Sequence, residues 1–280
     1  MEMIEKMYAS WAAGTAGGDD HWGDVTAEPR GVDYAEVSAG GTPAMWLSPH
    51  GAAADRAILA IHGGGFVGGS LYTHRKMYAH LAKAVGVPVL LTTYRLAPEA
   101  RYPAQIEDVL AAYDWVRGQV SRFAVTGDSA GGGLAVQAAL RSPGAAALLL
   151  ISPWLDMDPA LTAPTFDTNA GTDVFFTREM VRGLIDVYLP DGVSGVDPSV
   201  NPLFADLTTL PPTYIQVGGA EAGLGDSERL AALTEKAGVE TRLDIFPGLL
   251  HSFQMAAGYA PEADEAIARL AAWVRPRLAL

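Results

Sequence analysis

The chain has 280 residues, a formal net charge of −13, 49% hydrophobic residues and no cysteine. These residues suffice to bury a large core, and the acidic balance argues against binding to nucleic acid or anionic membranes. The lack of cysteine excludes disulfides, thiolate metal ligands and a cysteine nucleophile. The N-terminus shows no signal peptide and no apolar run is long enough to span a bilayer, so we expect a soluble cytoplasmic protein.

Short apolar runs alternate with amphipathic segments along the chain. The runs predict strands buried on both faces of a sheet, at residues 57–62, 87–94, 123–127, 146–151, 213–217 and 242–246. The segments between them predict helices at residues 75–84, 106–119, 132–140, 227–237 and 262–278. This alternation predicts an α/β fold, with a mostly parallel central sheet and helices on both faces. The Gly- and Asp-containing stretch 14–24 predicts a loop after an N-terminal helix.

One predicted helix, between residues 156 and 212, has no strand of its own. Thr177 is placed to cap it. Its apolar face carries Met180, Leu184, Val187 and Tyr188. An insertion after the carboxyl end of a strand lies over the crevice where open α/β sheets bind ligands. We therefore expect residues 1–40 and an insertion at about 160–205 to form a small helical cap over a main domain of residues 41–280.

The strongest motif is Gly127-Asp128-Ser129-Ala130-Gly131, which has the pattern G-x-S-x-G. It follows a predicted strand and opens a helix of small residues. A tight strand-to-helix turn raises the serine hydroxyl to the carboxyl edge of the sheet, at a helix N-terminus that favours a developing anion. This context favours Ser129 as a nucleophile over an incidental serine in a glycine-rich turn.

A second glycine motif, His62-Gly63-Gly64-Gly65-Phe66, comes directly after the first predicted parallel strand. Residues without side chains let backbone amides approach a substrate oxygen, and glycine tolerates the dihedral angles that turn several amides inward. We predict an oxyanion hole in which the amides of Gly64 and Gly65 act with the amide of Ala130.

The same loop also matches a dinucleotide-binding pattern through Gly63, Gly65 and Gly68. That site needs an acidic residue at the end of the next strand. The next predicted strand ends at Tyr94 and Arg95, with no acid. The dehydrogenase interpretation is therefore rejected.

In a nucleophile-elbow site an acid and then a histidine follow the serine in chain order. His251 is the only histidine beyond Ser129, and it follows a predicted strand. We therefore predict His251 as the general base.

The residues alone leave the acid open among three carboxylates. Glu221 and Asp226 lie in the loop after the predicted strand 213–217, and Asp156 follows the preceding strand. Asp226 is placed to cap the helix predicted to begin at residue 227, because aspartate is a preferred residue at helix N-caps. Glu221 lies nearer to the end of the strand, where catalytic groups gather.

Several motifs together resemble the hormone-sensitive-lipase-like esterases, also called bacterial family IV, of the α/β-hydrolase superfamily. They are HGGGF at 62–66, YRLAPE at 94–99, YPA at 102–104, GDSAGG at 127–132, SPWLD at 152–156 and LPPT at 210–213. The resemblance extends from about residue 40 to the C-terminus. The family's acid motif resembles D/E-x-L-x-D-D before a helix, and its first position matches Glu221, which is 30 residues (251 − 221) before His251. The chain departs from that motif at Gly223 and Gly225.

The resemblance implies a serine carboxylesterase acting on short- to medium-chain esters through an acyl-enzyme, with Ser129, Glu221 and His251 as its triad. It implies no metal and no organic cofactor. We expect Phe66, Met180, Val181 and Leu184 to shape the substrate pocket. The expected partner is a small-molecule ester or lactone, and a homodimer is left open.

Subgroups of the family open lactones or remove acetyl groups, and these alternatives stay open. Plant gibberellin receptors look similar but bind their ligand without hydrolysing it, and they have lost the catalytic histidine. The presence of His251 in this chain favours an enzyme.

Overall fold

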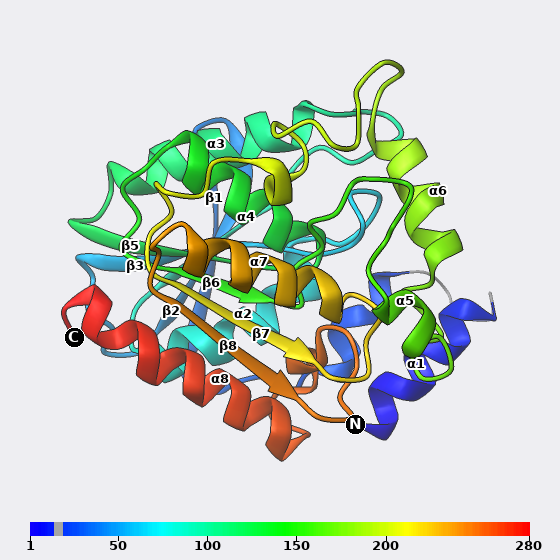
Figure 1. Cartoon of the computed structure of the whole chain (residues 1–280). Coiled ribbons are helices and arrows are strands. Elements are labelled where there is room, and N and C mark those ends of the chain that lie inside the picture. Colours follow the sequence, from blue (N-terminus) through cyan, green and yellow to red (C-terminus); the bar gives the residue numbers. More distant parts are fainter. Residues whose placement is uncertain (14–18) are drawn as a thin grey trace.

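The computed structural model describes residues 1–13 and 19–280. In this part of the chain eight strands form one sheet in the order β1-β2-β4-β3-β5-β6-β7-β8 (Figure 1). The strands are β1 Val32–Ala39, β2 Thr42–Pro49, β3 Arg56–Ile61, β4 Val89–Thr92, β5 Arg122–Asp128, β6 Leu148–Ile151, β7 Thr213–Gly218 and β8 Thr241–Phe246. β2 runs antiparallel to β1 and β4, and the other pairs are parallel. The predicted fold class and the six predicted strands are confirmed.

Helices cover both faces of the sheet. They are α1 Glu2–Ala12, α2 Leu71–Val85, α3 Ala104–Arg117, α4 Ala130–Arg141, α5 Thr165–Thr168, α6 Arg178–Tyr188, α7 Leu224–Lys236 and α8 Pro261–Val274. Short 3₁₀ helices are η1 Asp19–Val25, η2 Pro202–Phe204, η3 Phe253–Ala256 and η4 Arg275–Leu278. Successive residues of a strand face opposite sides. Leu59 therefore belongs to the core cluster that contains residues of α3, α4 and α7, whereas its neighbour Ile58 belongs to the cluster that contains residues of α1, α2 and α8.

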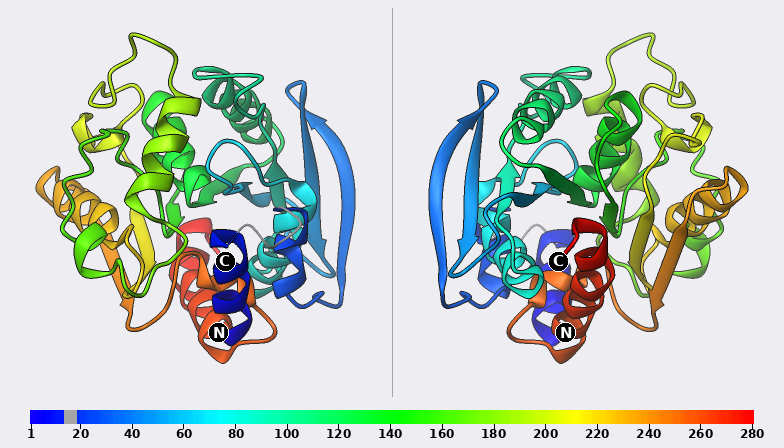
Figure 2. Two further views of the ribbon diagram at one scale, coloured as in Figure 1. Left: turned by 90° about the vertical axis from the view of Figure 1, so that its right-hand side faces the viewer. Right: turned by 90° about the vertical axis from the view of Figure 1, so that its left-hand side faces the viewer.

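The parallel strands point toward one side of the molecule, where α1, α5 and α6 gather (Figure 1). The left view of Figure 2 shows the molecule from this side, with α1 and α6 facing the viewer. Thr177 caps α6 as predicted, because its Oγ1 accepts a hydrogen bond of 3.2 Å from the amide of Met180. The carboxyl edge of the sheet is thus covered by segments from both the N-terminus and the insertion.

Two boundaries differ from the sequence-based expectation. Residues 32–39 fall within the expected N-terminal cap segment 1–40, but they form β1, which pairs with β2 along its whole length and belongs to the sheet. Within the stretch 14–24, which was predicted as a loop, residues 14–18 lie outside the described residues and η1 occupies the rest. The sequence did not predict β1 or η1, because neither segment has a clear periodic pattern of apolar residues.

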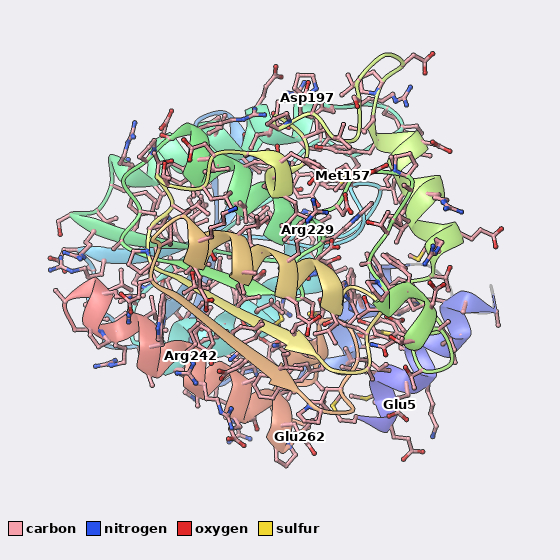
Figure 3. All side chains as sticks on the ribbon, viewed as in Figure 1. Glu5, Met157, Asp197, Arg229, Arg242 and Glu262 are labelled. Carbon is pink, nitrogen blue, oxygen red and sulfur yellow. The ribbon has the colours of Figure 1, made fainter. Side chains whose placement is uncertain are left out.

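No helix in the described ranges is both long enough and apolar enough to cross a membrane. Charged side chains such as those of Glu5 and Glu262 project from the outer surfaces of the helices (Figure 3).

Candidate active site

Ser129 stands alone between β5 and α4 with backbone angles of φ 52° and ψ −124°. A positive φ is uncommon for a residue with a side chain and needs support from its surroundings. The amide of Ser129 donates a 3.0 Å hydrogen bond to the carbonyl of Ile151, and its own carbonyl accepts bonds of 2.9 Å from the amides of Gly132 and Trp154. The backbone around the serine is therefore held from both sides.

The glycines of this turn are required by close backbone approach. A Cβ on Gly127 would lie 2.2 Å from the carbonyl oxygen of Gly131, and one on Gly131 would lie 2.2 Å from that of Ile61. Both distances are shorter than any real Cβ contact. The turn from β5 into α4 can therefore be this tight only with glycine at both positions.

The HGGG loop lies beside this turn with two glycines in left-handed conformations, φ 120° at Gly64 and φ 62° at Gly65. Among the described residues, none accepts a hydrogen bond from the backbone amides of Gly64, Gly65 or Ala130. The amide of Ala130 lies in the first turn of α4, where a helix has no internal acceptor. These three amides are the donors predicted for the oxyanion hole.

A buried carboxylate ties the HGGG loop to the elbow. Asp128 Oδ1 accepts a 3.0 Å hydrogen bond from the amide of Gly63 and a 2.8 Å bond from the hydroxyl of Tyr78. Its Oδ2 lies 3.3 Å from Nε2 of the buried His74. Burial pushes the pKa of Asp128 up, but His74, Tyr78 and His62 outweigh that effect, so the pKa is lowered and the carboxylate stays charged.

His251 is brought directly onto Glu221, and both side chains are buried. The imidazole Nδ1 pairs with Glu221 Oε2. The other oxygen, Oε1, accepts hydrogen bonds of 2.8 Å from the Ser152 hydroxyl and 2.7 Å from the Gly218 amide. The Ser152 hydroxyl in turn accepts a 3.0 Å bond from the amide of Ser252. Glu221 is thus fixed at both oxygens.

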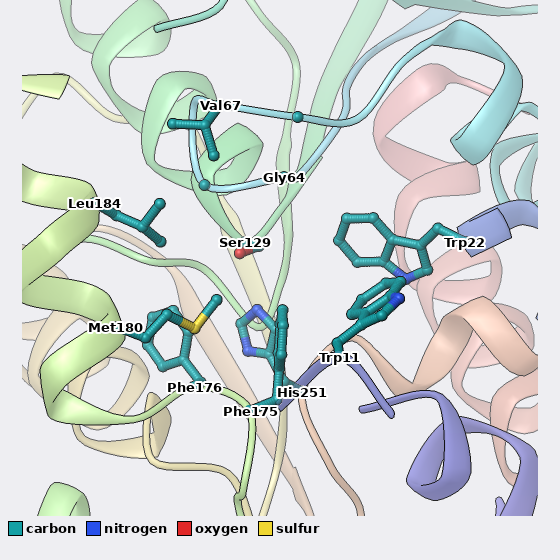
Figure 4. A pocket seen from close by; sticks show the side chains of 12 residues that line it. Trp11, Trp22, Gly64, Val67, Ser129, Phe175, Phe176, Met180, Leu184 and His251 are labelled. Carbon is teal, nitrogen blue, oxygen red and sulfur yellow. The ribbon is translucent and has the colours of Figure 1, made fainter. Parts of the chain in front are cut away.

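The second imidazole nitrogen of His251, Nε2, is buried and has no hydrogen-bond partner among the residues described. The ring of Phe176 lies flat on the imidazole, with centroids 4.8 Å apart and planes inclined by 7°. Burial by itself lowers the pKa of His251, but the charge and hydrogen bond of Glu221 outweigh it, so the pKa is raised. No hydrogen bond joins Nε2 to Ser129, yet both residues line the same cavity (Figure 4).

The other two carboxylates considered for the acid lie away from the imidazole. Asp226 Oδ2 accepts hydrogen bonds of 2.9 Å from the amides of Leu155 and Asp156. Asp156 bonds to the Asn201 side chain at 2.7 Å. The expectation that Asp226 caps a helix beginning at residue 227 is wrong, because α7 begins at Leu224 and the Asp226 side chain turns back to the chain after β6.

The cavity above Ser129 has a volume of about 360 Å³. Its lining comprises Trp11, Trp22, Gly64, Gly65, Val67, Gly68, Ser129, Phe175, Phe176, Met180, Leu184 and His251. Met180 and Leu184 are among the residues predicted to shape the pocket, and Figure 4 shows both on α6 at its wall. The four aromatic residues were missed. They belong to segments without any motif, and only their high aromatic density could have pointed to them.

Phe66 and Val181 were also predicted to line the pocket, but both have no exposed surface and are not part of its wall. Phe66 stacks on Tyr188 with ring centroids 3.8 Å apart. Val181 faces the core from α6, one position along from Met180. Adjacent positions on a helix or loop point in different directions, so this part of the prediction is corrected by the packing.

Comparison with known proteins places the chain among hydrolases. Residues 58–255 match the sequence profile of a family with the α/β hydrolase fold. An esterase of Acinetobacter venetianus is 36% identical over 228 residues, covering 79% of this chain and 75% of that protein. An acetyl-hydrolase of Streptomyces hygroscopicus is 35% identical over 248 residues, covering 85% and 81%.

A solved structure of an esterase from the bacterial hormone-sensitive lipase family superposes with a TM-score of 0.92 at 37% identity, covering 99% of this chain and 97% of that one. The fold and the elbow define an α/β hydrolase. The chain belongs to the hormone-sensitive lipase family of that fold and is a carboxylic ester hydrolase, which confirms the resemblance inferred from its motifs.

Proposed function

We propose that Ser129, His251 and Glu221 form the catalytic triad of an esterase for short, uncharged acyl esters. The observation that carries this proposal is the orientation of His251. Its Nδ1 is engaged by Glu221, while its unpartnered Nε2 and Ser129 line one cavity (Figure 4). This is the arrangement in which an imidazole can take a proton from a serine hydroxyl.

In the proposed reaction the Ser129 hydroxyl attacks the ester carbonyl as His251 Nε2 accepts its proton. The oxyanion of the tetrahedral intermediate is held by the amides of Gly64, Gly65 and Ala130, each worth about 3 kcal/mol. His251 then protonates the departing alcohol. Water, activated by the same imidazole, releases the acid from the acyl-enzyme.

The proposed substrate class rests on the character of the cavity. Apart from His251 its described lining carries no charged side chain, and aromatic and aliphatic residues dominate it. A charged substrate group would lose its hydration there without compensation. The acetyl-hydrolase name of one relative agrees with a short acyl group. Lactones and acetylated small molecules fit the same description and remain alternative substrates.

The cytoplasmic location and the homodimer stay predictions.

Hydrolysis of nitrophenyl esters from acetyl to decanoyl, with several lactones beside them, tests the substrate class. We expect the highest kcat/KM for the short acyl chains. Ser129→Ala should fold normally and lose several orders of magnitude in turnover. An organophosphate should label Ser129 alone, as read by peptide mass spectrometry. Labelling at another serine, or binding of esters without any turnover, would contradict the proposal, and the latter result would favour a receptor-like role.

A further inference from the structure

The loop that carries Glu221 has little of its own to hold its shape. The loop 219–223 between β7 and α7 begins and ends with glycine, and Gly218 at the end of β7 and Gly225 in the first turn of α7 flank it. Glycine has the largest backbone freedom of any residue. A loop of this composition must therefore be held from outside if Glu221 is to keep one position.

The cap segment that runs from α5 to Phe176 supplies this support. Asn169 Nδ2 donates hydrogen bonds of 2.8 Å to the carbonyl of Glu221 and 3.3 Å to that of Gly219. The Thr172 hydroxyl donates a 2.9 Å bond to the carbonyl of Ala220, and the Thr165 hydroxyl donates a 2.7 Å bond to that of Ala222. Four consecutive carbonyls, at residues 219–222, are thus bound by one short segment.

Asp173 joins this support to the other neighbour of His251. Its Oδ2 accepts a 2.8 Å hydrogen bond from the amide of Ala222, next to Glu221. Its Oδ1 accepts bonds of 2.9 Å and 3.2 Å from the amides of Phe176 and Phe175. The side chain is buried, and its hydrogen-bond partners in the described ranges are these three backbone amides. Three N–H donors therefore compensate the buried carboxylate, which makes these contacts costly to break.

We propose that Asp173 is a positioning residue of the hydrolytic reaction, acting on His251 through Glu221. The Asp173 carboxylate accepts hydrogen bonds from the amide of Ala222, next to Glu221, and from the amide of Phe176, whose ring stacks on the imidazole. The cap segment from α5 to Phe176 therefore supports the triad acid in addition to forming part of the pocket wall. The inference rests on the proposed role of Glu221.

The competing interpretation is that Asp173 only shapes the pocket by holding Phe175 and Phe176. The two interpretations differ in what they predict for the smallest substrate. A residue of the pocket wall changes KM and the preference among acyl chains. A residue that positions the acid lowers kcat for acetyl and butyryl esters by the same factor.

Asp173→Asn separates the two interpretations. The amide oxygen can still accept from Phe175 and Phe176, but its NH₂ group meets the amide of Ala222, so a donor faces a donor. We expect kcat to fall roughly 10- to 100-fold for acetyl and butyryl esters alike, because small misplacements of catalytic groups have effects of this size. KM should change little. Asp167→Asn is the control, because Asp167 is exposed on the same segment and its side chain pairs with Arg178.

The decisive measurement repeats Asp173→Asn in a Glu221→Gln background. If Asp173 acts through Glu221, the second substitution should lower kcat no further. An equal loss in both backgrounds, or an unchanged kcat for the acetyl ester in the single variant, overturns the inference. Wild-type turnover in Glu221→Gln alone overturns the proposed triad itself, and the inference with it. If Asp173→Asn does not fold, Asn169→Ala undergoes the same comparison, with the same outcomes expected.

Discussion

The hydroxyl of Tyr8 donates a 2.5 Å hydrogen bond to the backbone carbonyl of His251, 243 residues further along the chain. Its ring also stacks on Phe175, with centroids 4.7 Å apart and planes inclined by 4°. Burial, together with the negative charges of Asp173, Glu221 and Asp128, raises the pKa of Tyr8 well above its usual value, so the hydroxyl stays a donor. Helix α1 therefore contacts both the loop of the histidine and the cap.

Tyr8→Phe keeps the ring and removes only this hydroxyl. The carbonyl of His251 then loses its partner in a buried place, which costs about 1–3 kcal/mol of unfolding free energy. We expect a lower urea midpoint and a modest loss of kcat. Tyr259→Phe is the control, since Tyr259 is 62% exposed. Equal midpoints for the two variants would show that the Tyr8 contact adds nothing.

The acid side of the pH–rate profile reports the protonation of His251. Burial alone lowers its pKa, but Glu221, with smaller help from Asp173 and Asp128, raises it above 6.5. Only neutral imidazole can accept the serine proton, so kcat/KM should fall as pH drops through a midpoint above about 6.5. Glu221→Gln should move that midpoint down.

The folding stability depends on pH in the opposite direction to kcat/KM. Protonated His251 stabilises the folded state fully below its unfolded pKa, and this contribution is lost as pH rises through the folded pKa.

A midpoint at or below 6.5 in the wild type would contradict this balance between burial and Glu221. The measurement is kcat/KM for the acetyl ester between about pH 5 and pH 9, with a constant ionic strength because surface charges also contribute.

Gly65→Ala tests the oxyanion loop with less damage than Gly64→Ala. A Cβ on Gly64 would lie 2.2 Å from the backbone carbonyl oxygen of Gly68, whereas one on Gly65 would meet the tip of Leu184 at 2.9 Å. We expect Gly65→Ala to fold and to lose on the order of 10²-fold in kcat, because the amide is tilted from the oxyanion. Wild-type kcat in a stably folded Gly65→Ala variant would contradict the assignment of this amide to the oxyanion hole.

Asp226→Asn should leave turnover near the wild-type level, since its carboxylate faces the amides of Leu155 and Asp156. Burial raises the pKa of Asp226 from 3.8 to about 7. The folded state therefore holds a proton that the unfolded state lacks, and the stability from this group decreases as pH rises from about 4 to about 7. The asparagine variant should show a flatter dependence of Tm on pH across that window. An inactive Asp226→Asn beside an active Glu221→Gln would reverse the proposed assignment of the acid.

Met180 and Leu184 should set the acyl-chain preference. They lie one turn apart on α6 and both line the cavity. Met180→Ala widens the pocket, and each further methylene that it buries is worth about 0.8 kcal/mol, about fourfold in kcat/KM. We expect the optimum chain length to increase while the acetyl ester is little affected. Asp186→Ala, on the exposed face of the same helix, is the control. The same profile in both variants would show that α6 does not select the acyl chain.

The sequence by itself determined the parts of this protein that depend on local chemistry. The glycines at 127 and 131 are needed by a turn that brings backbone atoms within contact distance, so the elbow around Ser129 is readable from five residues. Nearly all-apolar runs identified the inner parallel strands, because strands covered on both faces need apolar side chains at most positions. His251 followed from chain order alone.

Only the tertiary structure decided which carboxylate faces His251. The residues alone left Glu221 and Asp226 open, and the family resemblance favoured Glu221. The structure shows Glu221 against the imidazole, whereas Asp226 lies in the first turn of α7 and turns to the chain after β6. The sequence also did not predict most of the residues that line the pocket. Trp11 and Phe175 come from segments without motifs, and Phe66 turned out to be buried behind the wall. These positions depend on packing between segments that are far apart in the sequence. The energy of such a contact depends on both residues together, so neither residue alone predicts it.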